Sequence, residues 1–294
     1  MRLDKYLADM GLGTRSELKK DIRAGAAMIN QQVVRDPGTA VSDADEVVFR
    51  GAPVMYESSV YYMLHKPAGV ITATRDSREK TVLNLLPDQA RKDLFPVGRL
   101  DRDTEGLLLI TNDGALAHRL LSPRHHVDKI YLAVVSGEPV SENEIAAFLQ
   151  GITLEDGTKC LPAELDSLNS ELAERYMPTD SYESSKGSAV SEKGSPVTEK
   201  AGAAFDLAVP GIAMLHAEEH RQSLASVQVT IREGKYHQIK RMFHAIGREV
   251  LYLKRISMGS LVLDPDLPAG ACRRLTSSEV AALKSVGMSA SPDR

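Results

Sequence analysis

The sequence is poor in aromatic residues, in cysteine and in long hydrophobic stretches. It has no Trp, and Phe, Tyr and Trp together make up 5% of its 294 residues. Its two cysteines, Cys160 and Cys272, lie far apart and give neither a metal-ligand spacing nor a disulfide framework, so we expect a protein of the reducing cytoplasm. No apolar run approaches the roughly 20 residues of a membrane span. The charged N-terminus indicates no signal peptide.

An excess of positive charge is also missing. The 36 basic and 40 acidic residues give a net charge of −4, which by itself argues weakly against a nucleic-acid binder. The deficit comes from one segment, because residues 163–204 contain four basic and eight acidic residues, and 4 − 8 = −4. The rest of the chain is therefore balanced overall, which is compatible with a local basic cleft.

Composition and periodicity divide the chain into two domains. We expect a small domain at residues 1–50, a linker at 51–58, a larger mixed domain at 59–285 and a disordered tail at 286–294. Residues 166 to about 222 are rich in Ser, Gly, Pro and Glu and show little periodicity. This composition predicts a flexible acidic insertion between strands of the larger domain.

A short basic helix is expected near the N-terminus. Thr14 and Glu17 have the spacing of a capping box, and Gly25 can end the helix that follows. Leu18 and Ile22 lie one turn apart and would face inward. The remaining surface carries the four cations Arg15, Lys19, Lys20 and Arg23. Such a surface is either solvated or binds phosphates, and the helix alone leaves both interpretations open.

The segment "GRLDRDTEGLLLITNDG" at residues 98–114 places charged residues directly before an apolar run. Leu107 to Ile110 is short, and Gly106 and Asn112-Asp113-Gly114 bound it, which predicts a buried strand. The charged residues would then form a loop that leads into the core. Loops on a rigid scaffold often carry chemistry, although a polar turn is the simpler interpretation.

The densest basic stretch is residues 232–259, where seven basic residues accompany two acidic ones. Apolar residues recur at helical spacing at 239, 242, 243 and 246, and Gly247 can end this helix. Its basic side is either solvated or faces a polyanion. We expect His237 to be structural or solvent-facing, because no second His or Cys stands in a metal-ligand geometry with it.

Two resemblances extend this interpretation. The segment "RLDKYLADMGLGTRSELKK" resembles the alpha-L RNA-binding motif, which is also present in a ribosomal small-subunit protein. Members of that family usually have Asn-Gly in the hairpin turn and a basic residue just before the first strand. This chain has Asn30-Gln31-Gln32 and Ala26-Ala27 instead, so the resemblance says more about the basic helix than about the hairpin.

The ordered motifs "KPAGVITA", "FPVGRLDRDTEGLLLITNDG", "KIYLAVV" and "GKYHQIKRMF" resemble the bacterial pseudouridine synthases that modify ribosomal RNA. The match is to the branch that acts on small-subunit (16S) RNA and its close large-subunit relatives. It implies an α+β fold, in which a mainly antiparallel sheet follows the small N-terminal module. It also implies Asp101 as the essential catalytic residue, Tyr131 as the aromatic partner of the target base, and Lys240 as the cation that pairs with Asp101.

The implied reaction explains these residue types. A uridine in RNA must lose its N1–C1′ bond, turn its base and gain a C5–C1′ bond. No redox change or external group is involved, so we expect no metal, dinucleotide or other cofactor. Asp101 can act as nucleophile or as base, and both roles stay open. The target base must be flipped out of the RNA to be reached. We predict phosphate contacts from Lys66, Arg99, Arg241, Lys254 and Arg255.

We therefore expect a monomeric enzyme whose partner is ribosomal RNA or a ribosomal subunit precursor. One alternative is a non-catalytic RNA-binding or ribosome-assembly factor on the same scaffold. A weaker one is a hydrolase that uses Asp101 and Asp103 as a carboxylate pair, and it would require water as a reactant and release a base.

Overall fold

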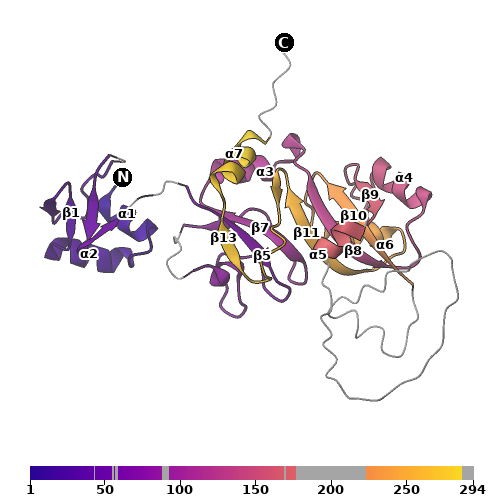
Figure 1. The fold of residues 1–294 in the computed structure, drawn as a ribbon, viewed down its shortest axis with the longest axis horizontal. Coiled ribbons are helices and arrows are strands. Elements are labelled where there is room, and N and C mark those ends of the chain that lie inside the picture. The colour runs from indigo at the N-terminus through magenta and orange to yellow at the C-terminus, as the bar shows by residue number, and fades with distance from the viewer. Residues whose placement is uncertain are drawn as a thin grey trace, which may run out of the picture.

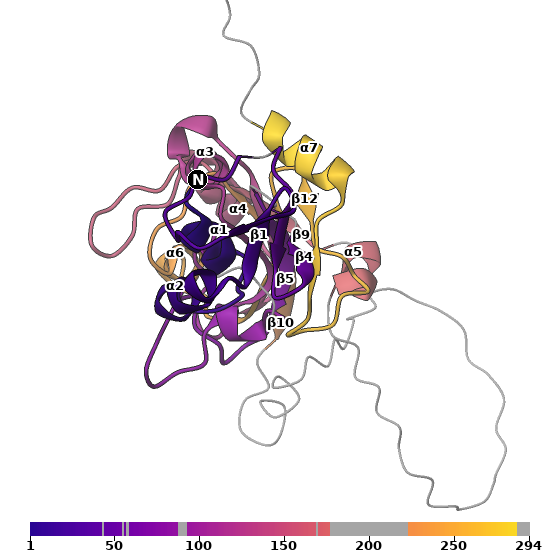
Figure 2. The same cartoon turned by 90° about the vertical axis from the view of Figure 1, so that its left-hand side faces the viewer.

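The structure, a computed structural model of the chain, describes residues 1–42, 44–54, 56, 59–87, 93–168, 170–176 and 223–286. Figure 1 shows a small N-terminal unit beside a larger unit that contains the C-terminal elements, and Figure 2 shows the N-terminal unit in front of the larger one. Most of the predicted insertion and nearly all of the predicted tail lie outside the described residues. No helix in the described ranges is long and apolar enough to cross a membrane.

The N-terminal unit packs two helices on a small antiparallel sheet. The helices are α1 (Leu3–Asp9) and α2 (Arg15–Ala24), and the strands, in the order β2-β1-β3-β4, are β1 (Ala27–Ile29), β2 (Gln32–Val34), β3 (Val47–Phe49) and β4 (Ala52–Val54). The predicted capping box is present: Thr14 Oγ1 accepts from the Glu17 amide, and the Glu17 carboxylate accepts from the Thr14 amide. Leu18 and Ile22 are fully buried. The basic side of α2 is therefore left at the surface.

The predicted linker begins too early. Strand β4 pairs with β3, with Val54 opposite Val47, and the Tyr6 hydroxyl donates to the Val54 carbonyl at 2.8 Å. Arg50 and Gly51 turn the chain back with φ values of +51° and +78°. The sequence prediction ended the unit at residue 50 because it did not identify this turn, and the N-terminal unit extends to residue 54.

The turn between β1 and β2 shows how the unit forms a hairpin without the usual glycine. Asn30 and Gln31 both have positive φ, at +48° and +68°, as a tight two-residue turn requires. Asn adopts this conformation at low cost, and its side-chain amide donates to the Asp45 carboxylate at 2.8 Å. The departure from Asn-Gly thus retains the two-residue turn.

The larger unit is built on a nine-stranded sheet within the described residues. Its path is β13-β5-β7-β11-β8-β10-β9, with β12 paired to β11 and β6 to β7. The strands are β5 (Tyr61–Lys66), β6 (Phe95–Pro96), β7 (Glu105–Thr111), β8 (Lys129–Ser136), β9 (Glu164–Ser167), β10 (Leu224–Ile231), β11 (Val250–Met258), β12 (Leu261–Val262) and β13 (Cys272–Arg274). Only β7 and β11 pair in parallel among the described strands. The α+β class with a mainly antiparallel sheet is therefore confirmed.

Helices cover both faces of this sheet. They are η1 (Val82–Leu85), α3 (Gly114–Leu121), η2 (Pro123–His125), α4 (Glu142–Gln150), α5 (Ser170–Tyr176), α6 (Gln238–Ala245) and α7 (Ser277–Ser285). Helices α4 and α6 pack in one core with Leu108 and Ile110 of β7, whereas α3 and α7 pack in a second core with Leu107 and Leu109. A strand buried on both faces explains the continuous apolar run in the sequence. The predicted strand at 107–110 and the predicted helix that ends near Gly247 are confirmed.

Gly106 allows the two central strands to approach closely. It has φ +103°, and a Cβ built on it would lie 2.2 Å from the Arg255 carbonyl oxygen. Any side chain here would separate β7 from β11 at their parallel pairing, where Gly106 lies opposite Arg255. The glycine therefore brings the loop before β7 against β11.

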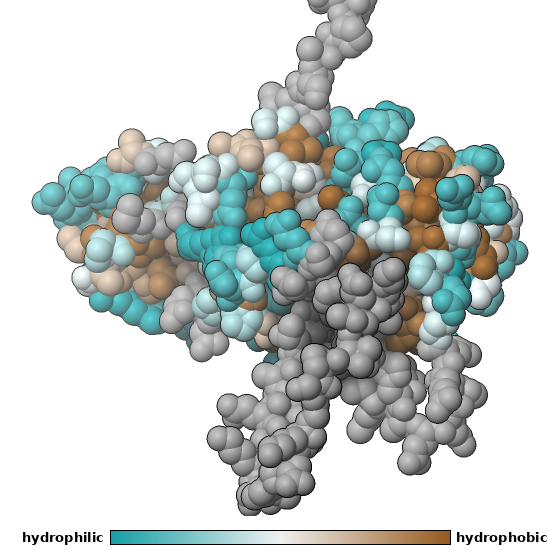
Figure 3. Space-filling model, turned by 45° about the vertical axis from the view of Figure 1, so that its right-hand side comes forward, coloured by the Kyte–Doolittle hydropathy of each residue, from teal (hydrophilic) through white to brown (hydrophobic). Residues whose placement is uncertain are grey.

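The predicted insertion also begins too early. Residues 166 and 167 belong to β9, which pairs with β10, and α5 follows. Tyr176 at the end of α5 is buried, and its hydroxyl donates to the Leu263 carbonyl at 3.1 Å. Leu168 and Leu172 also pack against the second core, and the polar residues around them obscured these contacts in the sequence. On the face shown in Figure 3, hydrophobic residues of the larger unit are interspersed with hydrophilic ones.

Candidate active site

A cavity of about 980 Å³ opens beside the loop that precedes β7. Its wall comes from five parts of the chain: 71–76, 98–104, 121–131, 231–239 with Lys240, and the β11 residues Leu253 and Arg255. The cavity therefore joins all four motifs of the larger unit that the sequence analysis singled out, or their immediate neighbours. Its size suits a nucleotide-sized group.

Asp101 lies in this wall on a loop that is fixed at both ends. On one side, Thr72 Oγ1 donates to the Leu100 carbonyl at 2.7 Å. On the other side, the Lys66 ammonium donates to the carbonyls of Arg102 and Thr104 at 3.2 and 2.9 Å. The Asp101 carboxylate remains 28% exposed. The fold thus holds the backbone rigidly and leaves the carboxylate accessible from the cavity.

Two residues of the 237–240 segment face the Asp101 carboxylate. His237 Nε2 lies 3.5 Å from one oxygen, and Lys240 Nζ lies 3.8 Å from the other. His237 adopts φ +48° at the start of α6, and its ring stacks on that of Tyr236 at 3.8 Å between centroids. Sequence reasoning missed His237, which we expected to be structural or solvent-facing. Its place two residues after Lys235 in the "GKYHQIK" motif was the available signal.

Lys240 is closer to Asp103 than to Asp101. Its ammonium donates to both Asp103 oxygens, at 2.6 and 2.7 Å. Burial alone would raise the pKa of Asp103, but the hydrogen bonds and charge of Lys240 outweigh it and the pKa is lowered. Asp103 therefore shares the Lys240 cation with Asp101.

Tyr131 lies on β8, in the wall of the cavity. It is buried, pairs with Arg255 in the β8–β11 register, and accepts a hydrogen bond from Arg255 Nη1 at 3.4 Å. Both residues line the cavity that contains Asp101. The structure therefore brings together the three residues that the sequence resemblance nominated, Asp101, Tyr131 and Lys240.

Three of the predicted phosphate contacts are buried groups instead. Lys66 is 0% exposed, and burial lowers the pKa of its amine to about 8. Lys254 is buried too and donates to the Tyr176 carbonyl at 2.9 Å. Arg255 is 2% exposed and donates to the Leu107 carbonyl at 2.8 Å. A backbone phosphate of RNA cannot reach side chains that are closed off in this way, so the structure argues against these three contacts.

The other predicted phosphate contacts differ in their exposure and in whether an acidic residue already pairs with them. Arg241 pairs with Glu155 at 2.7 Å and Asp156 at 2.6 Å, and it is absent from the cavity wall. Arg99 is exposed and lines the cavity. On α2, Arg15, Lys20 and Arg23 are exposed, and Lys19 is half-buried with its ammonium 3.9 Å from Asp4. Arg99 and the α2 cations thus remain available to an anionic partner.

Lys129 is a cavity residue that sequence reasoning did not nominate. It is 4% exposed, and its ammonium donates to the Val127 carbonyl at 2.9 Å. Burial, followed by the charge of Arg255, lowers the pKa of its amine to about 8. The available signal was the period-two pattern of a strand, which puts Lys129 and Tyr131 on the same face of β8. No group of three His, Cys, Asp or Glu residues in the described ranges could hold a metal ion.

Comparisons with known proteins identify the family of the chain. A family model described as RNA pseudouridylate synthase matches residues 60–245, and an S4 domain model matches residues 1–47. The chain belongs to the RNA pseudouridylate synthase family. It is an isomerase with an N-terminal RNA-binding S4 domain, which confirms the family, fold and enzyme class expected from the sequence.

Individual relatives are similar over nearly their whole length. The protein "Uncharacterized RNA pseudouridine synthase YtzG" of Bacillus subtilis (strain 168) is 39% identical, and the match covers 95% of this chain and 97% of that protein. "Ribosomal small subunit pseudouridine synthase A" of Haemophilus influenzae is 34% identical, covering 95% and 98%. "Ribosomal large subunit pseudouridine synthase B" of B. subtilis is 32% identical, covering 97% and 96%. A solved structure titled "Crystal structure of pseudouridylate synthase" is 33% identical, with a TM-score of 0.54 and coverage of 96% and 99%.

Proposed function

We propose that this pseudouridine synthase modifies one uridine of small-subunit ribosomal RNA and uses Asp101 as its essential carboxylate. The observation that carries the proposal is the placement of Asp101: it lies on a fixed loop in a nucleotide-sized cavity, within 4 Å of His237 and Lys240. The Lys240 ammonium, 3.8 Å from one oxygen of Asp101, supplies a positive charge beside the carboxylate. An ionised carboxylate serves equally as nucleophile at C1′ or as base at C2′.

Tyr131 is proposed as the partner of the flipped base. Its ring lines the cavity, and the hydrogen bond from Arg255 fixes its hydroxyl. A uridine stacked within RNA would not reach Asp101, so the nucleotide must turn out of the strand into the cavity. An aromatic face then replaces the stacking that the base loses.

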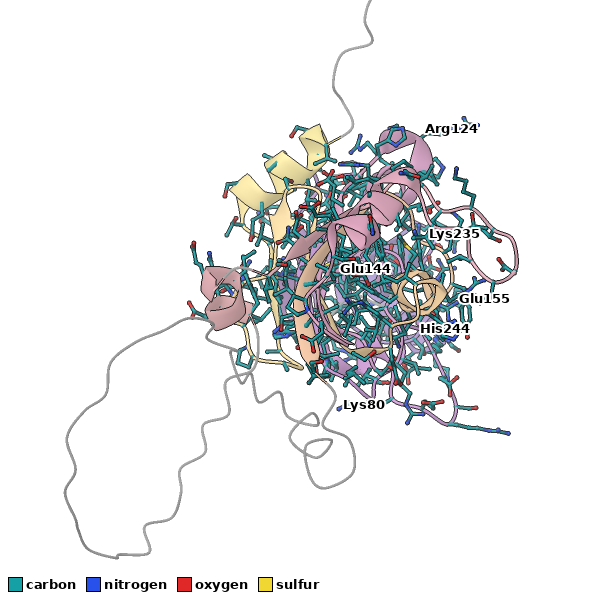
Figure 4. The ribbon with its side chains drawn as sticks, turned by 90° about the vertical axis from the view of Figure 1, so that its right-hand side faces the viewer. Lys80, Arg124, Glu144, Glu155, Lys235 and His244 are labelled. Carbon is teal, nitrogen blue, oxygen red and sulfur yellow. The ribbon has the colours of Figure 1, made fainter. Side chains whose placement is uncertain are left out.

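The RNA itself is proposed to contact exposed cations outside the reacting centre. Arg99 lies at the cavity, and Figure 4 shows the exposed Lys80 and Arg124 at the periphery of the same unit. The cations of α2 supply a second contact surface. Phosphate contacts of this kind fix position and carry little sequence information. We further propose that the enzyme acts as a cytoplasmic monomer, on ribosomal RNA or on a subunit precursor.

The small-subunit assignment follows the names of several relatives, and one large-subunit relative is similar to nearly the same degree. Pseudouridines should therefore be mapped in both ribosomal RNAs of cells with and without the protein. The purified enzyme should be tested in parallel on unmodified 16S and 23S transcripts and on precursor particles. A site lost from 16S RNA supports the proposal, and a site lost from 23S RNA would replace it. Normal RNA binding without any new pseudouridine would favour the non-catalytic alternative.

A further inference from the structure

Two buried cations lie side by side in the wall of the cavity. Lys129 on β8 and Arg255 on β11 flank Tyr131, and their side chains are 4% and 2% exposed. Lys129 Nζ has one hydrogen bond, to Val127, which leaves two N–H groups. Arg255 donates from Nε to Leu107 and from Nη1 to Tyr131, whereas its Nη2 is buried without a hydrogen-bond partner.

No carboxylate in the described part of the chain forms an ion pair with either cation. Asp128 and Glu233 are the acids whose charges act on Lys129, but Asp128 binds Arg232 and Glu233 binds Lys235 and Gln238. Burying two like charges next to each other without a counter-charge is costly. An anionic group that binds between Lys129 and Arg255 offsets this cost.

Two polar atoms without a hydrogen-bond partner belong to residues of this cavity wall. Four buried side-chain atoms in the described ranges have no hydrogen-bond partner, and two of them, Arg255 Nη2 and Thr104 Oγ1, belong to residues that line this cavity. Buried donors normally have partners, so these atoms indicate a ligand. A backbone phosphate stays at the RNA surface, whereas a flipped base enters the cavity, which makes the base the fitting ligand.

We propose that Lys129 and Arg255 form a cationic floor that binds the carbonyl oxygens of the target uracil and stabilises the negative charge that the ring carries after it leaves the ribose. This inference rests on the proposed function of Asp101 in the same cavity. It assigns both cations a role in chemistry, where the sequence analysis gave Arg255 a phosphate contact and gave Lys129 none.

The charge develops on either route open to Asp101. If the carboxylate attacks C1′, the Oδ–C1′ bond forms while the N1–C1′ electron pair leaves with the base. If it removes the C2′ proton, a C1′=C2′ double bond forms and the same electron pair leaves with the base. The uracil anion spreads this charge over O2 and O4. The ring then turns and C5 bonds to C1′, the first route returning a pair to the carboxylate and the second returning a proton to C2′. The C5 proton is finally lost and N1 gains one, so the product is an isomer.

Lys129→Met is the direct test, because it keeps the chain length and removes the charge. Turnover of the full-length enzyme on its ribosomal RNA transcript at saturation should fall about 100-fold, the scale on which one preorganised donor acts. The Michaelis constant should change little, because the cationic floor contacts only the flipped base and not the rest of the RNA. The melting temperature should not fall, because an unpaired buried cation is removed. Turnover within about threefold of the wild type would overturn the proposal.

Two further variants separate charge from structure. Lys129→Arg keeps the positive charge, so its turnover should exceed that of Lys129→Met by at least about tenfold. Lys284→Met makes the same chemical change on α7, outside the cavity wall, and should leave turnover unchanged. The rate of the wild type should also decline as pH rises through about 8, where the Lys129 amine loses its proton. Asp101, His237, Lys240 and Arg255 line the same cavity, the charges of Asp128 and Glu233 act on Lys129, and Lys66 behind the Asp101 loop also has a pKa lowered to about 8. The assignment therefore requires that the high-pH decline be clearly shallower in Lys129→Met than in the wild type. Failure of Lys129→Arg to recover activity, or an unchanged high-pH decline in Lys129→Met, would overturn the role of the charge.

A binding experiment tests the floor independently of the RNA target. The probes are uracil and 6-azauracil, an analogue whose ring readily becomes an anion near neutral pH, and the signal is the Tyr131 ring resonance in the full chain. The wild type should prefer 6-azauracil, and Lys129→Met should lose that preference. No preference in the wild type would overturn the floor. The wild type could instead prefer 6-azauracil and yet form no pseudouridine in either ribosomal RNA. In that case the proposed function fails, whereas the cationic floor stands.

Discussion

The cations of helix α2 and those around the Asp101 cavity have the same side chains in opposite surroundings. Arg15, Lys20 and Arg23 are exposed on one side of a short capped helix. Lys66 and Arg255 are closed off from solvent and donate to backbone carbonyls. Exposed cations gain affinity for a polyanion and are screened by salt, whereas buried ones fix the backbone and act on charges inside the cavity.

This difference separates placement of the RNA from reaction of the base. Changes on α2 should act on binding and leave the chemical step alone. Changes in the cavity should act on the chemical step, because binding lost equally from ground and transition states does not alter the maximal rate.

The largest effect is expected from Asp101→Asn. The change keeps the size of the side chain and removes its charge and basicity, so turnover should fall by at least about a thousandfold, as when an essential catalytic group is lost. RNA affinity should stay close to that of the wild type, since one cavity residue contributes little to a polyanion contact. Quantification of pseudouridine after a long single-turnover reaction measures the loss. Substantial turnover by this variant would remove Asp101 from the catalytic role.

Asp103→Asn is the matched control for the same loop. Asp103 is largely exposed and shares Lys240 with Asp101, so neutralising it should release the Lys240 ammonium toward Asp101. We expect a much milder change, within about tenfold in turnover, because no reacting atom is removed. Equal losses in the two variants would instead support the carboxylate-pair alternative, in which both residues take part in a hydrolysis.

The next effect is expected from replacing Arg15, Lys19, Lys20 and Arg23 together with Ala. Binding at low salt should weaken by several kcal/mol, at roughly 1 kcal/mol for each charge-assisted contact, and the loss should shrink as salt rises. Turnover at saturating RNA should change far less than the Michaelis constant. Binding titrations across a salt series measure both the affinity and the slope. A double variant of the exposed Lys159 and Lys284 serves as control, and normal binding with an unchanged slope in the quadruple variant would make α2 a solvated face.

The sequence predicted the elements whose signals are local. The capping box at Thr14 formed as expected, and so did the buried strand after Gly106. These features depend on residues within one or two turns of each other. The family motifs then placed Asp101, Tyr131 and Lys240 around one cavity, although their spacing alone could not show the distances.

The sequence could not show which cations are buried. Lys66 and Lys254 sit on strands whose neighbours cover them. Burial of a side chain is decided by tertiary packing across β5, β7 and β11, and local composition carries no record of it. The same limit explains why the pairing of Lys240 with Asp103, a contact 137 positions apart in the chain, was missed.

A smaller effect should distinguish buried from exposed lysines through stability. Lys129 has a pKa of about 8 in the folded protein against 10.5 for the free side chain. The difference corresponds to a cost of about 3 kcal/mol for holding the charged amine in the folded state. Below pH 8 the lysine is charged in both states and this cost is fully present. Between pH 8 and 10.5 the unfolded chain binds more protons, so the folded state gains stability, and above 10.5 the cost is gone.

Lys129→Met should therefore be more stable than the wild type by about 1 to 3 kcal/mol near pH 7, after allowing for the lost hydrogen bond to Val127. Its advantage should disappear as the pH rises from 8 to 10.5. Denaturant unfolding across this range measures the difference. Lys20→Met removes an exposed lysine and should change stability by less than about 0.5 kcal/mol at every pH. Destabilisation of Lys129→Met at pH 7 would show that the buried cation stabilises the fold after all.

The smallest effect is expected from the acidic insertion, once its start is corrected. Residues 181–219 contain six acidic and three basic residues, a net charge of 3 − 6 = −3, and their composition is rich in Ser, Gly and Ala. Replacing them with a short Gly-Ser linker should change the free energy of unfolding by less than about 1 kcal/mol, because loop length affects closure entropy only weakly. RNA affinity at low salt should rise slightly as three negative charges are removed, and maximal turnover should stay the same. Tyr176→Ala, just before the deletion, should cost about 3 kcal/mol or more, since it removes a buried aromatic ring. A deletion as destabilising as Tyr176→Ala would mean that the insertion packs against the larger unit.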